Sequence, residues 1–155
     1  MSPTHLRSLT FSLAPTPAMV GAARRRIVDA LTCWGVAPSN AAMGAMCLIS
    51  AELIGNAVRH AGTVTQRILV ELRVDTRGQV VLGVRDQDER LPYVRHAGLL
   101  EDSGRGLPLV SALLTEYQGR LWITRGSRPG KTVWAAFRLP EKYAPTEYSE
   151  PAYAA

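Results

Sequence analysis

A polar stripe runs along an otherwise apolar segment, in the stretch SAELIGNAVRHAG. Glu52, Asn56 and His60 follow one another at intervals of four residues, so in a helix their side chains project from one face. A carboxylate, an amide and an imidazole can exchange protons or bind polar ligands. Met, Leu and Ile are frequent in the residues around them. The stripe is therefore either the solvent-facing side of a helix or the floor of a functional site.

Two further segments place polar or glycine residues where elements are expected to end or begin. The apolar stretch VVLGV leads to Asp86, so a carboxylate stands at a strand end beside a loop. It is either a surface residue that ends the strand or part of a site. Gly104-Arg105-Gly106 precedes an apolar segment, and glycines there permit close approach of a bound anion to helix N–H groups. A lone Gly-x-Gly also serves as ordinary turn chemistry.

The stretch RGSRPGKTVW contains Gly-Lys-Thr, the triplet that ends a phosphate-binding P-loop. A P-loop needs four residues between its first glycine and this triplet, but only three separate Gly126 from Gly130. A P-loop also opens a helix, whereas strand-like residues flank this stretch on both sides. Two such runs separated by Gly and Pro predict a β-hairpin. The P-loop interpretation is rejected.

The elements that must position these residues follow from periodicity and from capping residues. Thr16 is expected to cap the first helix and Gly35 to follow it, while Gly119 is expected to stop the third. The order β-α-α-β-β-loop-α-β-β indicates an α+β fold, a two-layer α/β sandwich with helices on one face of a mixed, mainly antiparallel sheet. The expected elements are a strand at 7–13, helices at 16–34 and about 38–61, strands within 65–75 and at 79–86, a helix at 106–118, and strands at 120–125 and 132–139.

The composition is typical of one soluble globular domain. The 155 residues are 46% hydrophobic and 20% charged, which suits a single sizeable core. The net charge is +5, but without a helix-turn-helix pattern or an aromatic-interleaved basic stripe we expect no direct nucleic-acid partner. No signal peptide or membrane span is expected, and Cys33 and Cys47 are expected to be buried, reduced thiols. We therefore expect a cytoplasmic protein with no membrane partner.

In their order along the chain, four segments resemble one superfamily. ELIGNAVRHA, the strand that ends at Asp86, GRGLPLV and GKTVWAAF are similar to the GHKL ATPases, which include histidine kinases, Hsp90, gyrase B and MutL. The compact length is most similar to the anti-sigma-factor serine kinases, and more closely to small ATP-binding regulators of actinobacterial type. The resemblance implies a Bergerat-type sandwich. A histidine-kinase-like ATP-binding domain is then expected over residues 1–139, followed by a flexible C-terminal tail over residues 140–155.

The resemblance implies roles for the polar residues, with ATP and Mg²⁺ as cofactors. Asn56 matches the Mg²⁺-binding asparagine, and a neutral amide oxygen suits a hard cation that also takes phosphate oxygens and waters. Glu52 matches the general base, whose carboxylate accepts a proton from a serine hydroxyl or from water. Asp86 matches the residue that accepts a hydrogen bond from the adenine amino group. His60 is expected to pack or hydrogen-bond rather than to take part in catalysis.

The glycine-rich segment and the hairpin also receive roles from the resemblance. Gly104 and Gly106 match glycines whose backbone amides frame the phosphates, and we expect Arg105, between them, to add positive charge near the γ-phosphate. Thr132 matches a hairpin threonine that helps to hold adenine, often through water. The GKT triplet then touches the nucleotide at the base, and Lys131 has no phosphate role.

One residue departs from the family pattern. The glycine that follows the adenine-reading aspartate by two positions is replaced by Asp88. A side chain there would crowd the pocket, and a charge that points inward would repel phosphates, so weakened nucleotide binding is expected.

Two functional hypotheses remain open. The leading one is an ATP- and Mg²⁺-binding, anti-sigma-like regulator, a serine/threonine kinase whose partners are a sigma factor and an anti-anti-sigma protein. The other is a non-catalytic binding module that uses nucleotide weakly or as a structural ligand. Because relatives of this type form homodimers, a homodimer is expected.

Overall fold

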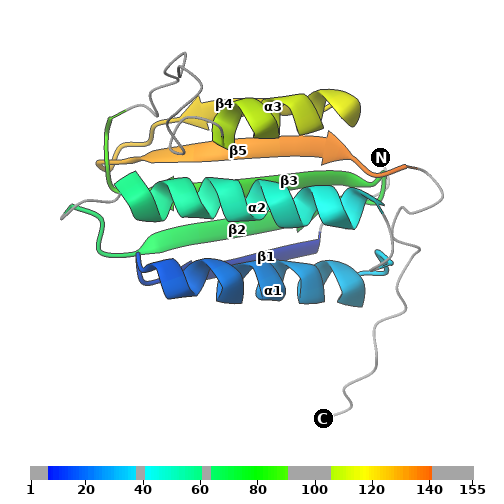
Figure 1. Cartoon of the computed structure of the whole chain (residues 1–155), viewed down its shortest axis with the longest axis horizontal. Coiled ribbons are helices and arrows are strands. Elements are labelled where there is room, and N and C mark those ends of the chain that lie inside the picture. Colours follow the sequence, from blue (N-terminus) through cyan, green and yellow to red (C-terminus); the bar gives the residue numbers. More distant parts are fainter. Residues whose placement is uncertain (1–6, 38–40, 61–63, 91–105, 141–155) are drawn as a thin grey trace, which may run out of the picture.

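The chain forms a five-stranded sheet covered on one face by three helices (Figure 1). The structure, a computed structural model, describes residues 7–37, 41–60, 64–90 and 106–140. The predicted tail, from residue 141 on, lies outside the described residues. The elements are β1 (Arg7–Leu13), α1 (Pro17–Cys33), α2 (Ala41–His60), β2 (Ile68–Val74), β3 (Gln79–Asp86), α3 (Gly106–Glu116), β4 (Arg120–Thr124) and β5 (Lys131–Arg138).

The sheet confirms the predicted two-layer α/β sandwich. Its strands lie in the order β1-β2-β3-β5-β4, and all four described pairings are antiparallel. β5 lies between β3 and β4, so β4 forms the edge of the sheet. Because β3 and β5 are antiparallel, the end of β3 lies beside the start of β5. This register places Asp86 opposite Lys131.

The core lies between the sheet and the helices. Val80, Leu82 and Val84 alternate along β3 and are fully buried, because residues two apart in a strand share one face. Helix α1 contributes Ala23, Ile27 and Leu31 at helical spacing, which is the period of an amphipathic helix. The helices therefore bury an apolar row of β1, β2, β3 and β5, whereas no residue of β4 is fully buried.

The helix ends lie close to those that the sequence predicted. Thr16 precedes α1 with an extended backbone, although its side chain makes no capping hydrogen bond, and Pro17 occupies the first turn, where a missing N–H costs nothing. Gly35 follows α1 with φ +96°, a conformation that suits glycine. Helix α3 ends at Glu116, and Gln118, two residues later, has φ +53°, an unusual value for a residue with a side chain.

Helix α2 is the central helix of the helical layer (Figure 1). Among the described residues it alone is long and apolar enough to cross a membrane, but over half of its most apolar stretch is buried within the domain. It packs against α1, α3 and the central strands, so we interpret it as a core helix. The two cysteines are free; Cys33 is exposed and Cys47 is half-buried, so the prediction of buried thiols is wrong.

The other face of the sheet carries no helix in the described part of the chain (Figure 1). Trp122 and Trp134 stack there with ring centroids 6.0 Å apart. Gly83 lies beneath the Trp134 ring, and a Cβ atom at position 83 would overlap it. Every second side chain of β5 points to this face, as that of Trp134 does. The place of Thr132 in this alternation decides where its side chain points.

Candidate functional site

The polar stripe of α2 is held together by an arginine. The side chain of Glu52 is 27% exposed, so this part of α2 is reached by solvent. Arg59 Nη2 donates a hydrogen bond of 2.6 Å to Asn56 Oδ1 and lies 3.9 Å from Glu52 Oε2. A carboxylate and an amide oxygen therefore share one cation. Because both oxygens are acceptors, the same place suits another cation.

The start of α3 lies against this stripe. A Cβ atom at Gly106 would overlap the Glu52 carboxylate and stand 3.9 Å from Asn56 Oδ1. Glycine therefore allows the first turn of α3 to approach the two oxygens of α2 closely. Helix N-termini present free N–H groups to anions. The structure thus brings Glu52 and Asn56 of the polar stripe together with Gly106, which the sequence singled out in a separate segment.

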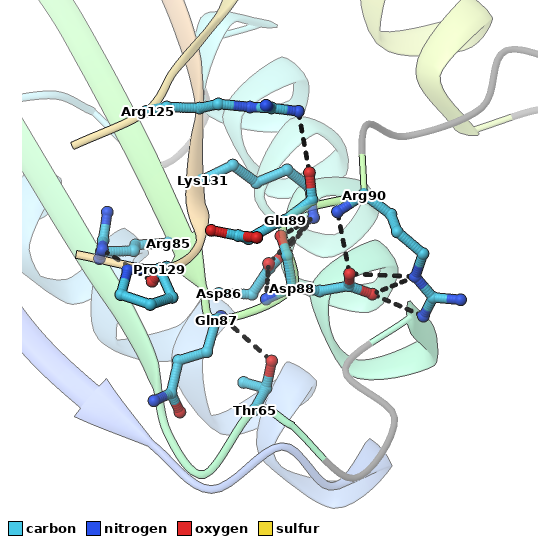
Figure 2. Close-up of polar contacts among 10 residues, drawn as sticks. All are labelled: Thr65, Arg85, Asp86, Gln87, Asp88, Glu89, Arg90, Arg125, Pro129 and Lys131. Atoms are coloured by element: carbon cyan, nitrogen blue, oxygen red, sulfur yellow. Dashed lines mark hydrogen bonds and ion pairs between the residues drawn. The ribbon is translucent and has the colours of Figure 1, made fainter. Parts of the chain in front are cut away.

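Asp86 is buried and paired with a lysine (Figure 2). Lys131 Nζ lies 2.9 Å from Asp86 Oδ1 and 3.1 Å from Oδ2, and donates a third hydrogen bond of 2.9 Å to the Asp88 carbonyl oxygen. Both side chains are 5% exposed. Gly130, with φ +117°, makes this possible, because a Cβ atom there would overlap the Asp86 carbonyl oxygen.

Asp88, which replaces the family glycine, is neutralised by its neighbour. Its carboxylate accepts hydrogen bonds from Arg90 Nε at 3.0 Å and from Arg90 Nη2 at 2.6 Å (Figure 2). Hydrogen bonding from the Arg90 guanidinium lowers the pKa of Asp88 to about 2, against the opposing effect of burial. The backbone N–H of Asp88 donates to Asp86 Oδ1 at 2.9 Å. The carboxylate of Asp88 thus forms an ion pair with Arg90.

Thr132 does not join this group. In the β3–β5 register it lies opposite Arg85, whereas Lys131 lies opposite Asp86. Neighbouring strand residues face opposite sides of a sheet, so Thr132 points to the face without helices. Arg85 on that face donates to the Pro129 carbonyl oxygen at 3.2 Å. The position beside Asp86, expected for the threonine, is occupied by Lys131.

Asp86 and the polar stripe lie at the same end of the domain. Helix α2 ends at His60, and a few residues later Thr65 Oγ1 accepts a hydrogen bond of 3.1 Å from the Gln87 N–H, next to Asp86 (Figure 2). The last turn of α2 and the end of β3 lie on the same side of the domain (Figure 1). His60 itself is exposed. Gly104 and Arg105 lie outside the described residues.

Three residues of this region were not predicted as site residues from the sequence. Arg59 and Lys131 each contact a predicted site residue, and Arg90 contacts the residue that replaces the family glycine. Lys131 had a signal in the sequence, because Val133, Ala135 and Phe137 alternate as an inward row and extend back to Lys131. Arg90 had none, because its contact depends on the backbone path after β3.

The oxygen atoms of this site suit a metal ion that takes most of its ligands from outside the protein. Among the described residues, no group of three or more His, Cys, Asp or Glu side chains could hold a metal ion. Mg²⁺ is commonly bound through one or two protein oxygens together with substrate phosphates and waters. Asn56 Oδ1, beside Glu52 and the first turn of α3, fits that use.

Two solved structures are similar to this fold over most of the chain. One contains the RsbU and RsbW domains of Rv1364c from Mycobacterium tuberculosis, at 20% identity and a TM-score of 0.61, covering 85% of this chain and 32% of that chain. The other is the histidine kinase domain of a blue-light activated histidine kinase from Erythrobacter litoralis, at 20% identity and a TM-score of 0.50, covering 83% of this chain and 66% of that chain. At these identities the likeness shows the fold alone. Among curated proteins, none matches the sequence.

A family model settles the membership. The histidine kinase-like ATPase domain matches residues 13–137, a span that runs from the last residue of β1 to the end of β5 and includes Glu52, Asn56, Asp86 and Gly106. The chain belongs to the histidine kinase-like ATPase domain family.

Proposed function

We propose that the chain binds ATP with Mg²⁺ and acts as an anti-sigma-like regulator, a serine/threonine protein kinase for an anti-anti-sigma partner. The observation that carries the proposal is the meeting of Glu52, Asn56 and the Gly106 end of α3 in one place. A base, a cation ligand and a helix N-terminus are three of the parts that phosphoryl transfer needs. The RsbW domain in one similar structure supports this choice through its fold.

The chemistry proposed for the site follows from its oxygens and amides. Glu52 would take the proton of the partner's hydroxyl group as that oxygen attacks the γ-phosphorus of ATP, and ADP would leave. Asn56 would hold Mg²⁺, which neutralises phosphate charge when bound. The N–H groups at the start of α3 would receive phosphate oxygens, and Asp86 would accept a hydrogen bond from the base.

A thermal-shift experiment tests nucleotide binding directly. ATP and ADP, each with Mg²⁺, should raise the unfolding midpoint, because a ligand that binds the folded state stabilises it by mass action. Asn56→Ala should reduce the part of the shift that depends on Mg²⁺. No shift with any nucleotide at millimolar concentration would contradict the proposal.

A second candidate function is a non-catalytic regulatory module, and two observations favour it. Asp86 is already paired with Lys131, and Asp88 stands where the family has glycine. A phosphate-transfer assay with radiolabelled ATP and a cognate antagonist protein separates the two functions. Transfer supports the kinase, whereas ATP binding without transfer supports the module.

The remaining expectations about assembly and location belong to the same proposal. A homodimer in the cytoplasm, with a sigma factor as one partner, agrees with an anti-sigma-like role. Light scattering after size-exclusion chromatography measures the oligomeric state, because a dimer has twice the 16.9 kDa mass of the chain.

A further inference from the structure

We propose that Lys131 is a positioning residue that makes Asp86 selective for a base carrying an amino group. The inference rests on the proposed function, because it concerns the base end of the same nucleotide site. It gives the lysine of the GKT triplet a role at the base, although the triplet is not part of a P-loop.

Lys131 is fully used by its three hydrogen bonds. Its ammonium group has three N–H donors, and three acceptors surround it, the two oxygens of Asp86 and the Asp88 carbonyl oxygen, at 2.9 to 3.1 Å. With its side chain 5% exposed, the ammonium group has no donor left for a ligand. Lys131 therefore acts on a ligand through Asp86.

The acceptor positions of Asp86 can be counted in the same way. A carboxylate has about four lone-pair positions, two on each oxygen. Oδ1 accepts from Lys131 and from the Asp88 N–H, so both of its positions are taken. Oδ2 accepts from Lys131, and no other described hydrogen bond reaches it. One acceptor position on Oδ2 therefore remains for a ligand.

The contacts of Lys131 fix the direction of that position, and so decide what it can bind. An ionised carboxylate only accepts hydrogen bonds, and Lys131 bonds to both oxygens of Asp86 and holds them in one orientation. Adenine presents an amino N–H at its 6-position, whereas hypoxanthine presents a carbonyl oxygen there. Of the other charges nearby, Asp88 is turned to Arg90, and Arg125 donates to the Glu89 carbonyl oxygen (Figure 2). Lys131 is the one described cation bonded to Asp86.

Without Lys131, Asp86 loses the hydrogen bonds to both of its oxygens and keeps only the one from the Asp88 N–H. The carboxylate can then turn, so its acceptor position no longer meets the amino group of adenine. Removing the Lys131 ammonium group should therefore reduce the preference for ATP over inosine triphosphate, not only the affinity for ATP.

The test compares ATP and inosine triphosphate, which differ at the 6-position, by calorimetric titration of the full chain with Mg²⁺. The wild type should prefer ATP by about ten- to a hundredfold, the range for a hydrogen bond to a charged group. Lys131→Met, which keeps the length of the side chain and removes its charge, should bring the ratio of the two affinities close to one.

A matched control removes a different cation from the same segment. Arg125→Met loses the exposed guanidinium that bonds to the Glu89 carbonyl oxygen at 2.9 Å, and it should keep the wild-type ratio. If Lys131→Met does not fold, as judged by circular dichroism, Lys131→Gln takes its place, because its shorter amide can still donate to Asp86 but has two N–H donors instead of three. A smaller fall in the ratio is expected.

The outcomes separate the inference from the proposed function. If the wild type binds ATP and the Lys131 variants weaken both nucleotides equally, Lys131 has only a structural role and the inference is overturned. A wild type that binds both nucleotides equally also overturns it. If the wild type binds neither nucleotide, the proposed function fails, and the inference fails with it.

Discussion

The guanidinium of Arg59 donates a hydrogen bond of 2.6 Å to the amide oxygen of Asn56. It therefore occupies the atom to which Mg²⁺ binding is proposed. The Arg59 side chain is 48% exposed, so it can leave this position at small cost. A cation of α2 thus bonds to the atom at which the metal cation is proposed to bind.

Arg59→Met should make ATP binding more dependent on Mg²⁺. Without the metal, Arg59 is the described cation beside Glu52 and Asn56, so its loss should weaken metal-free ATP binding about three- to tenfold. With Mg²⁺ the loss should be smaller, because the metal supplies the charge. Calorimetric titrations with Mg²⁺ and with EDTA measure both. An equal loss of ATP affinity in the two conditions would show that Arg59 and Mg²⁺ do not occupy the same position.

Gly106→Ala should displace the Glu52 carboxylate without unfolding the protein. The added Cβ would meet the end of a flexible side chain rather than backbone, so Glu52 can move away. Phosphate transfer should fall more than ATP binding, as measured with radiolabelled ATP and a partner protein. Gly44→Ala is the matched control, because nothing lies within 4 Å of a Cβ atom there. Equal activity of the two variants would remove Gly106 from the site.

Glu52→Gln should preserve ATP binding and reduce phosphate transfer about 10²- to 10⁴-fold, the usual contribution of a general base. The amide keeps the size of the side chain but cannot take a proton. Glu116→Gln, at the exposed far end of α3, controls for the substitution itself. Transfer at the wild-type rate in Glu52→Gln would exclude Glu52 as the base.

Much of this arrangement could be predicted from the sequence, and the parts that could not have physical causes. Helix α1 and strands β1 and β3 lie where caps and alternation placed them, because local residues determine those ends. The meeting of Gly106 with Glu52 depends on how α3 packs on α2, which no local pattern contains. It followed from the resemblance of the ordered motifs.

Thr132 shows where the resemblance was insufficient. The strand row Val133, Ala135 and Phe137 points inward, so its neighbour Thr132 must point outward and Lys131 inward. Applying the two-residue period of a strand would have placed both residues correctly. The pairing of Lys131 with Asp86 depends in addition on the register between β3 and β5, which is set by long-range pairing.

Asp88 should stabilise the fold above pH 4 and lose this effect in acid. Its pKa is lowered from 3.8 to about 2 in the folded state, so protons bind more readily to the unfolded chain. The stabilisation is complete above the unfolded pKa of 3.8 and is lost as the pH falls through about 2. Because Arg90 is 78% exposed, we expect a contribution of about 1 kcal/mol rather than the full value of the shift.

Urea unfolding of the wild type and Asp88→Asn between pH 7 and pH 2 measures this contribution. The difference in free energy of unfolding should be constant from pH 7 to about pH 5 and should shrink below pH 4. A difference that stays the same down to pH 2 would show that the Asp88–Arg90 pair does not cause it.

We propose that Glu52, Asn56, Asp86 and Gly106 border one ATP site. Amide NMR spectra of the isotope-labelled chain, titrated with ATP and Mg²⁺, test this arrangement, because bound nucleotide shifts the signals of nearby backbone groups. The largest shifts are expected on these four residues and on their neighbours in α2, β3 and α3. Shifts confined to the sheet face that carries Trp122 and Trp134, or no shifts at saturating ATP, would contradict it.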